Sequence, residues 1–160
     1  MMKKKLLIFG AGETGEMAAE LFTCDSKEKV FGFIVEDKFW KQGLTKCGFP
    51  VFKLSTIEEF YPSEKFKVFV ALGSGHLNRD RLKFYNFFKS KSYNLISYVS
   101  TRANIWRTVQ IGDNCLIFEG NNLQHKVRIG NNTTLWSYNH IGHGSTLGSS
   151  TFVSSNVCVA

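Results

Sequence analysis

The 160-residue sequence lacks any long hydrophobic run. The apolar stretch Leu6 to Phe9 breaks at Gly10 and Glu13, so the sequence offers neither a secretory signal nor a membrane span. It also lacks paired cysteine spacing of the kind that metal sites and disulfide scaffolds use. The four cysteines are Cys24, Cys47, Cys115 and Cys158. We therefore expect a cytoplasmic protein with reduced thiols and no metal.

The net charge of +7 is not gathered into one stripe. The lysines are scattered, and the second half of the chain carries no arginine row interleaved with aromatic residues. Nucleotide phosphates account for such a charge, and we expect these rather than nucleic acid as partners.

An aliphatic residue returns at every sixth position between Val99 and Val159, which is neither a helical nor a strand period. The positions are Val99, Ile105, Ile111, Ile117, Leu123, Ile129, Leu135, Ile141, Leu147, Val153 and Val159. This period fits a parallel β-helix, in which three six-residue faces make one coil around a narrow core. Glycine follows the aliphatic residue at Gly112, Gly130, Gly142 and Gly148, and there we expect the sharp turns between strands.

The first hundred residues alternate between apolar runs and helical spacing. Residues 6–9, 30–35 and 67–72 read as buried strands, and residues 16–22 and 77–89 as helices. Ser55 is a candidate N-cap for a short helix. The alternation predicts a parallel α/β sheet.

Glycine turns follow two of these predicted strands, at residues 10–15 and 73–75. Such turns let backbone approach phosphate closely and direct a helix N-terminus at the anion. Ninety-odd residues are few for a dinucleotide fold, so we predict a cradle for the diphosphate of a nucleotide-linked compound. The acidic segment after the second strand is expected to meet the ribose or base. The predicted binding residues are Gly10, Gly12, Thr14, Gly15, Glu36, Asp37, Lys38, Gly73 and Gly75.

The whole chain resembles the sugar acyltransferases of the sialic acid O-acetyltransferase and bacillosamine N-acetyltransferase group. The likeness lies in residues 9–15, 32–37 and 135–143. It implies a Rossmann-like nucleotide-sugar-binding domain over residues 1–98 and a left-handed β-helix over residues 99–160. It also implies a homotrimer in the full-length form. The implied activity is acyl transfer, most often of acetyl from acetyl-CoA, to an amino or hydroxyl group of a nucleotide-linked deoxysugar.

The resemblance assigns the general base to His143, five residues before Gly148. A neutral imidazole there would take the proton from the sugar's nucleophile. His140 is the second candidate for this role. His125 lies one predicted coil before His143 on the same corner, as does Arg107 a further coil back.

Two features depart from the family pattern. Gly144 follows His143 where many relatives carry an orienting carboxylate, so Asn139 or a backbone carbonyl would have to orient the ring. The backbone N–H that polarises the thioester is expected beyond Ala160, which indicates a fragment of a longer protein.

Two other functions compete with acyl transfer. The chain could be a nucleotide-sugar-binding or assembly module without turnover, because later coils are lacking. The glycine fingerprint alone would also suit a nicotinamide-dependent oxidoreductase, which the predicted solenoid opposes.

Overall fold

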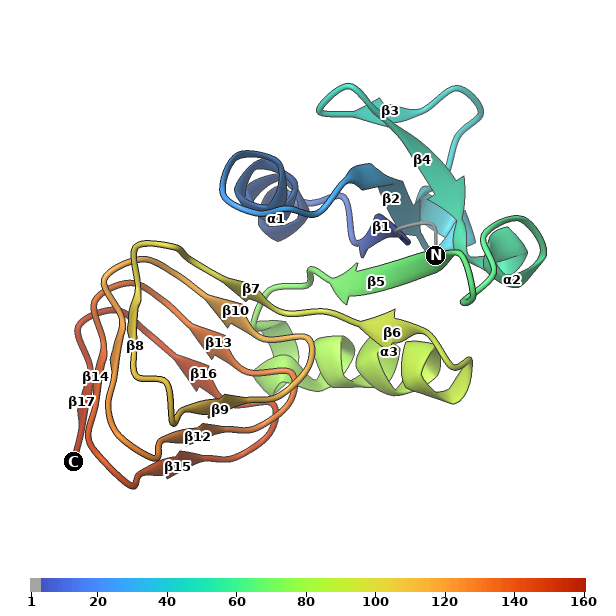
Figure 1. Ribbon diagram of the computed structural model, residues 1–160. Helices are drawn as coiled ribbons and strands as arrows, with labels where there is room; N and C mark the ends of the chain where they lie inside the picture. The colour runs from blue at the N-terminus through green and yellow to red at the C-terminus, as the bar shows by residue number, and fades with distance from the viewer. Residues whose placement is uncertain (1–3) are drawn as a thin grey trace. The chain divides into compact units, whose positions relative to one another are not determined.

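The structure is a computed structural model that describes residues 4–160. The chain forms two compact units, Met1–Ile96 and Ser97–Ala160. The first unit combines a sheet with helices, and the second is built from short parallel strands (Figure 1). The predicted order of an α/β part followed by a β-solenoid is confirmed. Within residues 4–160 no helix is long and apolar enough to cross a membrane.

The sheet of the first unit has the strand order β3-β4-β2-β1-β5-β6. Its strands are β1 (Lys5–Phe9), β2 (Val30–Val35), β3 (Thr45–Lys46), β4 (Phe49–Lys53), β5 (Phe66–Val70) and β6 (Asn94–Leu95). Neighbours pair in parallel, except that β3 runs antiparallel to β4. The order of strands along the chain reverses between β1 and β5. Ligands of open α/β sheets bind at such a reversal, outside the carboxyl ends of the strands.

Helices α1 (Glu13–Cys24) and α3 (Arg79–Ser90) pack on opposite faces of this sheet. Phe22 of α1 meets Phe69 of β5 with ring centroids 5.2 Å apart, and Phe84 of α3 meets Phe9 of β1 at 4.2 Å. Phe9 pairs with Val70, the neighbour of Phe69, and successive strand residues point to opposite faces. The central strands are therefore covered on both sides, which explains their continuous apolar runs.

Two local predictions in this unit are wrong. Helix α3 begins at Arg79 rather than Leu77, because Leu77 and Asn78 have left-handed backbone in the short segment η3 (Gly75–Asn78). Ser55 does not cap a helix: it lies inside the 3₁₀ turn η2 (Leu54–Thr56) that precedes α2 (Ile57–Phe60). Its hydroxyl donates to the carboxylate of Asp37 in η1 (Asp37–Phe39).

The second unit winds through three faces of parallel strands, one strand of each face per coil (Figure 1). The first face holds β7 (Tyr98–Val99), β10 (Leu116–Ile117), β13 (Thr134–Leu135) and β16 (Phe152–Val153). The second holds β8 (Asn104–Ile105), β11 (Asn122–Leu123), β14 (His140–Ile141) and β17 (Cys158–Val159). The third holds β9 (Gln110–Ile111), β12 (Arg128–Ile129) and β15 (Thr146–Leu147). The repeating aliphatic residues line one core, with Leu123, Leu135 and Ile141 fully buried.

The corners turn by a different device from the one we predicted. None of the glycines that follow the aliphatic residues has a positive φ. They are needed for room instead: a Cβ on Gly130 would lie 2.5 Å from the backbone nitrogen of Ser149 in the next coil. The left-handed position comes third after the aliphatic residue. It is occupied by Asn114, Gly120, Lys126, Asn132, Tyr138, Gly144, Ser150 and Asn156.

One corner is held by a ladder of buried amides. Nδ2 of Asn114 donates to Oδ1 of Asn132 at 2.8 Å, and Nδ2 of Asn132 donates to Oγ of Ser150 at 3.0 Å. Both asparagines have no exposed surface. Asparagine tolerates left-handed backbone better than most residues with a Cβ, and its amide satisfies polar groups that the corner would otherwise leave unpaired.

Candidate functional site

A cavity of about 990 Å³ opens in the first unit at the carboxyl ends of β1, β2 and β5. Six of the predicted binding residues line it: Gly10, Gly12, Glu36, Lys38, Gly73 and Gly75. Thr14, Gly15 and Asp37 do not. The cavity therefore gathers both predicted glycine turns and the end of β2 around one space, at the reversal of strand order.

The three glycines after β1 differ in their surroundings. Gly10 has a φ of +104°, and a Cβ there would lie 2.7 Å from the carbonyl oxygen of Ala71. A Cβ on Gly15 would strike the carbonyl oxygen of Gly10, so Gly15 lets α1 approach the sheet. Gly12 has open space around it and is the N-cap of α1, where no side chain caps the helix. The helix N-terminus thus keeps backbone N–H groups for an anionic ligand.

The two acidic residues after β2 have different roles: Asp37 joins two loops, and Glu36 lines the cavity. Asp37 accepts hydrogen bonds from the hydroxyl and, at 3.0 Å, from the backbone N–H of Ser55, and these bonds hold the pKa of Asp37 below its ordinary value. Its carboxylate is engaged in joining two loops. Glu36 faces the cavity with Lys38, whose Nζ lies 3.2 Å from the Glu36 carboxylate. Phe39, a residue that no sequence pattern indicated, also lines the cavity and is 62% exposed.

His143 lies on the solenoid corner after β14 and is exposed. Its backbone N–H donates to Oε1 of Gln124 at 3.2 Å, and the N–H of Gly144 donates to the carbonyl of His125 at 2.8 Å. Within residues 4–160 the imidazole itself has no hydrogen-bond partner. Its two nitrogens remain available to a substrate.

The other predicted histidines are engaged within the solenoid. Nδ1 of His125 lies 3.0 Å from Oγ1 of Thr108, and its ring meets Trp106 edge to face. Nδ1 of His140 accepts from Nδ2 of Asn122 at 3.3 Å on the second face. His125 and His143 do share one corner, as their spacing predicts, whereas His140 lies on a flat face.

The Asn139 side chain makes its hydrogen bonds within the wall of the solenoid. Its Nδ2 donates to the carbonyl of Trp136 at 2.7 Å, and its Oδ1 accepts from the N–H of Val157 at 2.8 Å. The amide is buried. It holds the corner before β14 rather than reaching His143.

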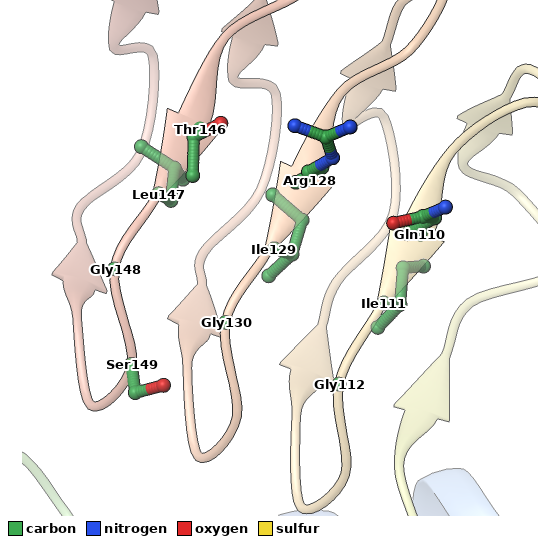
Figure 2. Close-up of a pocket in the computed structure, with 10 residues that line it drawn as sticks. All are labelled: Gln110, Ile111, Gly112, Arg128, Ile129, Gly130, Thr146, Leu147, Gly148 and Ser149. Atoms are coloured by element: carbon green, nitrogen blue, oxygen red, sulfur yellow. The ribbon is translucent and has the colours of Figure 1, made fainter.

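A groove of about 430 Å³ crosses three coils on the third face (Figure 2). Gln110, Arg128 and Thr146 lie side by side on successive coils, each followed by an aliphatic residue and a glycine (Figure 2). Arg128 is exposed, and within residues 4–160 its guanidinium makes no hydrogen bond or ion pair. A narrow, extended ligand with an anionic group fits these features. Among residues 4–160 no group of three or more His, Cys, Asp or Glu side chains could hold a metal ion.

Comparisons with known proteins place the fold. No protein-family model and no curated protein sequence matches the chain. Among solved structures, perosamine N-acetyltransferase from Caulobacter crescentus, as a histidine-to-asparagine variant with CoA and GDP-perosamine, superposes with a TM-score of 0.72 at 17% identity. The alignment covers 99% of this chain and 90% of that one. The chain has the fold of this sugar acetyltransferase.

Two further structures agree. The acetyltransferase domain of PglB from Neisseria gonorrhoeae, in complex with acetyl coenzyme A, gives a TM-score of 0.65 at 18% identity, covering 99% of this chain and 92% of its own. WeeI from Acinetobacter baumannii gives 0.57 at 18% identity, covering 99% and 97%. Each of these likenesses is one of fold, at 17–18% identity.

Proposed function

We propose that the protein transfers an acetyl group from acetyl-CoA to an amino or hydroxyl group of a nucleotide-linked deoxysugar. The observation that carries this proposal is a glycine-lined cavity in the α/β unit together with an unpartnered imidazole at a solenoid corner. The fold is that of enzymes whose structures hold CoA and GDP-perosamine, or acetyl coenzyme A.

The first unit supplies nucleotide binding in this proposal, as a Rossmann-like domain. Gly10, Gly12, Gly73 and Gly75 bring backbone N–H groups to the diphosphate, beside the uncapped N-terminus of α1. Glu36 accepts hydrogen bonds from the ribose or base at the end of β2. Thr14 and Gly15 support the turn from behind the cavity, and Asp37 holds its loop through Ser55.

The second unit, a left-handed β-helix in this proposal, supplies the chemistry. The sugar's amine or hydroxyl attacks the thioester carbonyl carbon, and neutral His143 takes the proton that the nucleophile loses. The carbon–sulfur bond then breaks, and the imidazolium returns the proton to the leaving thiolate. The exposure of the His143 ring and, within residues 4–160, its lack of a hydrogen-bond partner support this role. His125 and His140, each held by a neighbouring side chain, line the approach.

The third face fits the acyl donor. The groove crosses three coils and accommodates a slender chain along them, and Arg128 offers a planar guanidinium to a phosphate. Acetyl-CoA combines such a chain with phosphates. The functional assembly in this proposal is a homotrimer, and its partners are nucleotide sugar and acetyl-CoA.

The test is a thiol-release assay. The protein is mixed with acetyl-CoA and a panel of UDP- and GDP-linked amino sugars, and free coenzyme A is measured with a thiol reagent. We expect acceptor-dependent release that the His143→Ala variant abolishes. Release that does not depend on any acceptor, or on His143, would contradict the proposal.

A second candidate is a nucleotide-sugar-binding module without turnover. It is favoured by one observation: every residue that lines the large cavity belongs to the first unit. Calorimetric binding of a nucleoside diphosphate combined with no thiol release would select it. Tight binding of a nicotinamide dinucleotide would instead point to the oxidoreductase alternative.

A further inference from the structure

The loop after β5 contains an unusual backbone. His76, Leu77 and Asn78 have φ values of 50°, 55° and 62°, the only run of three left-handed residues within residues 4–160. Left-handed backbone is unfavourable for residues with a Cβ. Leu77 gains no compensating burial, because 85% of its surface is exposed. Strain that packing does not repay is typical of functional segments.

This turn presents a paired imidazole to the cavity. Nδ1 of His76 donates to Oδ2 of Asp80 at 2.7 Å, and both residues line the space between the glycine turns and α3. The pairing fixes the ring and leaves Nε2 for a ligand. Lys83 lies three residues beyond Asp80 on the same helix and lines the same wall.

One lysine at the cavity has no ion pair within residues 4–160. Lys38 pairs with Glu36, Lys46 pairs with Glu16, and the carboxylate of Asp80 accepts a hydrogen bond from His76. Within the described chain Lys83 has no carboxylate partner, and its Nζ lies 4.9 Å from the ring centroid of Phe84. The ammonium of Lys83 lies at the same cavity as the glycine turns and the N-terminus of α1, and these groups together favour an anionic ligand.

We propose that Lys83 and His76 form a second side of the phosphate cradle, opposite the Gly10–Gly12 turn, and bind the diphosphate of the nucleotide substrate. The inference rests on the proposed nucleotide-sugar site and names two contacts in it. The left-handed turn serves to bring His76 to this wall, with Asp80 holding its ring.

Calorimetric titration with GDP and UDP, and with guanosine and uridine, tests this assignment. We expect Lys83→Met and His76→Ala each to weaken diphosphate binding roughly tenfold, the loss of one charge-assisted contact. Nucleoside binding should not change. Lys83→Arg keeps the charge and should keep most of the affinity. Lys89→Met, on the same helix outside the cavity, is the matched control, and melting temperatures verify folding.

The outcomes separate this inference from the proposed function. If the unaltered protein binds GDP or UDP and both variants bind equally well, the cradle assignment is overturned while the acetyltransferase proposal stands. If the unaltered protein binds neither diphosphate, both are overturned. Diphosphate binding that depends on Lys83, without acetyl transfer, supports the cradle and removes only the enzymatic proposal.

Discussion

The backbone N–H of His143 donates to the side-chain oxygen of Gln124, which lies on the preceding coil, at 3.2 Å. The next residue, Gly144, has a φ of +72°. The equivalent position of other corners carries residues with a Cβ, such as Lys126 and Tyr138, so the backbone at Gly144 does not by itself exclude the orienting carboxylate that the sequence resemblance implies. Two groups of the preceding coil, the side chain of Gln124 and the carbonyl of His125, hold the backbone of this corner in position.

Gln124→Met should lower kcat roughly tenfold with little change in KM, because a displaced base hinders the chemical step more than substrate binding. Gln124→Glu keeps an acceptor oxygen and should restore most of kcat. Asn131→Leu is the control, since Oδ1 of Asn131 accepts from the backbone N–H of Asp113 on a different corner, at 3.0 Å. Equal losses in Gln124→Met and Asn131→Leu would show a general effect on the coils.

His143→Ala should lower turnover by about 10²–10⁴-fold, the usual contribution of a general base. Steady-state thiol release with saturating substrates measures it. His140→Ala should reduce turnover only a few-fold, because His140 lies on a flat face and is held by Asn122. The reverse pattern would transfer the role of base to His140.

Gly12→Val and Gly15→Val should fail in different ways. A Cβ on Gly12 meets no atom within 4 Å, so this variant should fold normally and lose nucleotide affinity. A Cβ on Gly15 strikes the carbonyl of Gly10, so that variant should melt at a lower temperature. Thermal melting with and without UDP or GDP distinguishes the two, since a ligand of the native state raises the melting point. Unchanged affinity in Gly12→Val would show that the cradle is misplaced.

Asn132→Ala should lower the free energy of unfolding by about 1–3 kcal/mol, because it removes the bonds to Asn114 and Ser150 from a side chain with no exposed surface. Urea unfolding measures the loss. Asn104→Ala is the control: its bond to Asn122 is exposed and should be worth at most about 0.5 kcal/mol. Similar losses in both variants would mean that burial of the ladder is unimportant.

Tyr93 should make stability depend on pH in the alkaline range. Its hydroxyl donates to the carbonyl of Tyr61 at 2.8 Å, and burial raises the pKa of Tyr93 from 10.0 to about 12. The folded state thus favours the neutral phenol, and this contribution is complete below pH 10 and is lost as the pH rises through 12. The difference in unfolding free energy between the unaltered protein and Tyr93→Phe should shrink over that interval. A constant difference would contradict the assignment.

The solenoid could be predicted from the sequence because its rule is local and repeated. Each aliphatic residue from Val99 to Val159 fills the same position on its face, so one interruption would have been visible. The reason for the glycines was not visible. Gly130 is glycine because Ser149 lies against it, and that contact spans 19 residues of sequence.

The cavity was predicted in part for a similar reason. Glycine turns after β1 and β5 are local signals, and the parallel sheet brings them together. The bond between Asp37 and Ser55 joins two loops and leaves no pattern in the sequence. Nothing in the composition of residues 76–78 indicates three left-handed residues. The bond of Gln124 to His143 could not be predicted either, because it forms only when two successive coils lie side by side.

The 18-residue spacing of the ladder partners limits how such a chain can vary in length. An insertion of one or two residues in a corner would rotate every later strand away from its partner and break the file of stacked amides at that point. Gains and losses of sequence are tolerable as whole turns of the spiral, so homologous solenoids should differ in length by multiples of one winding.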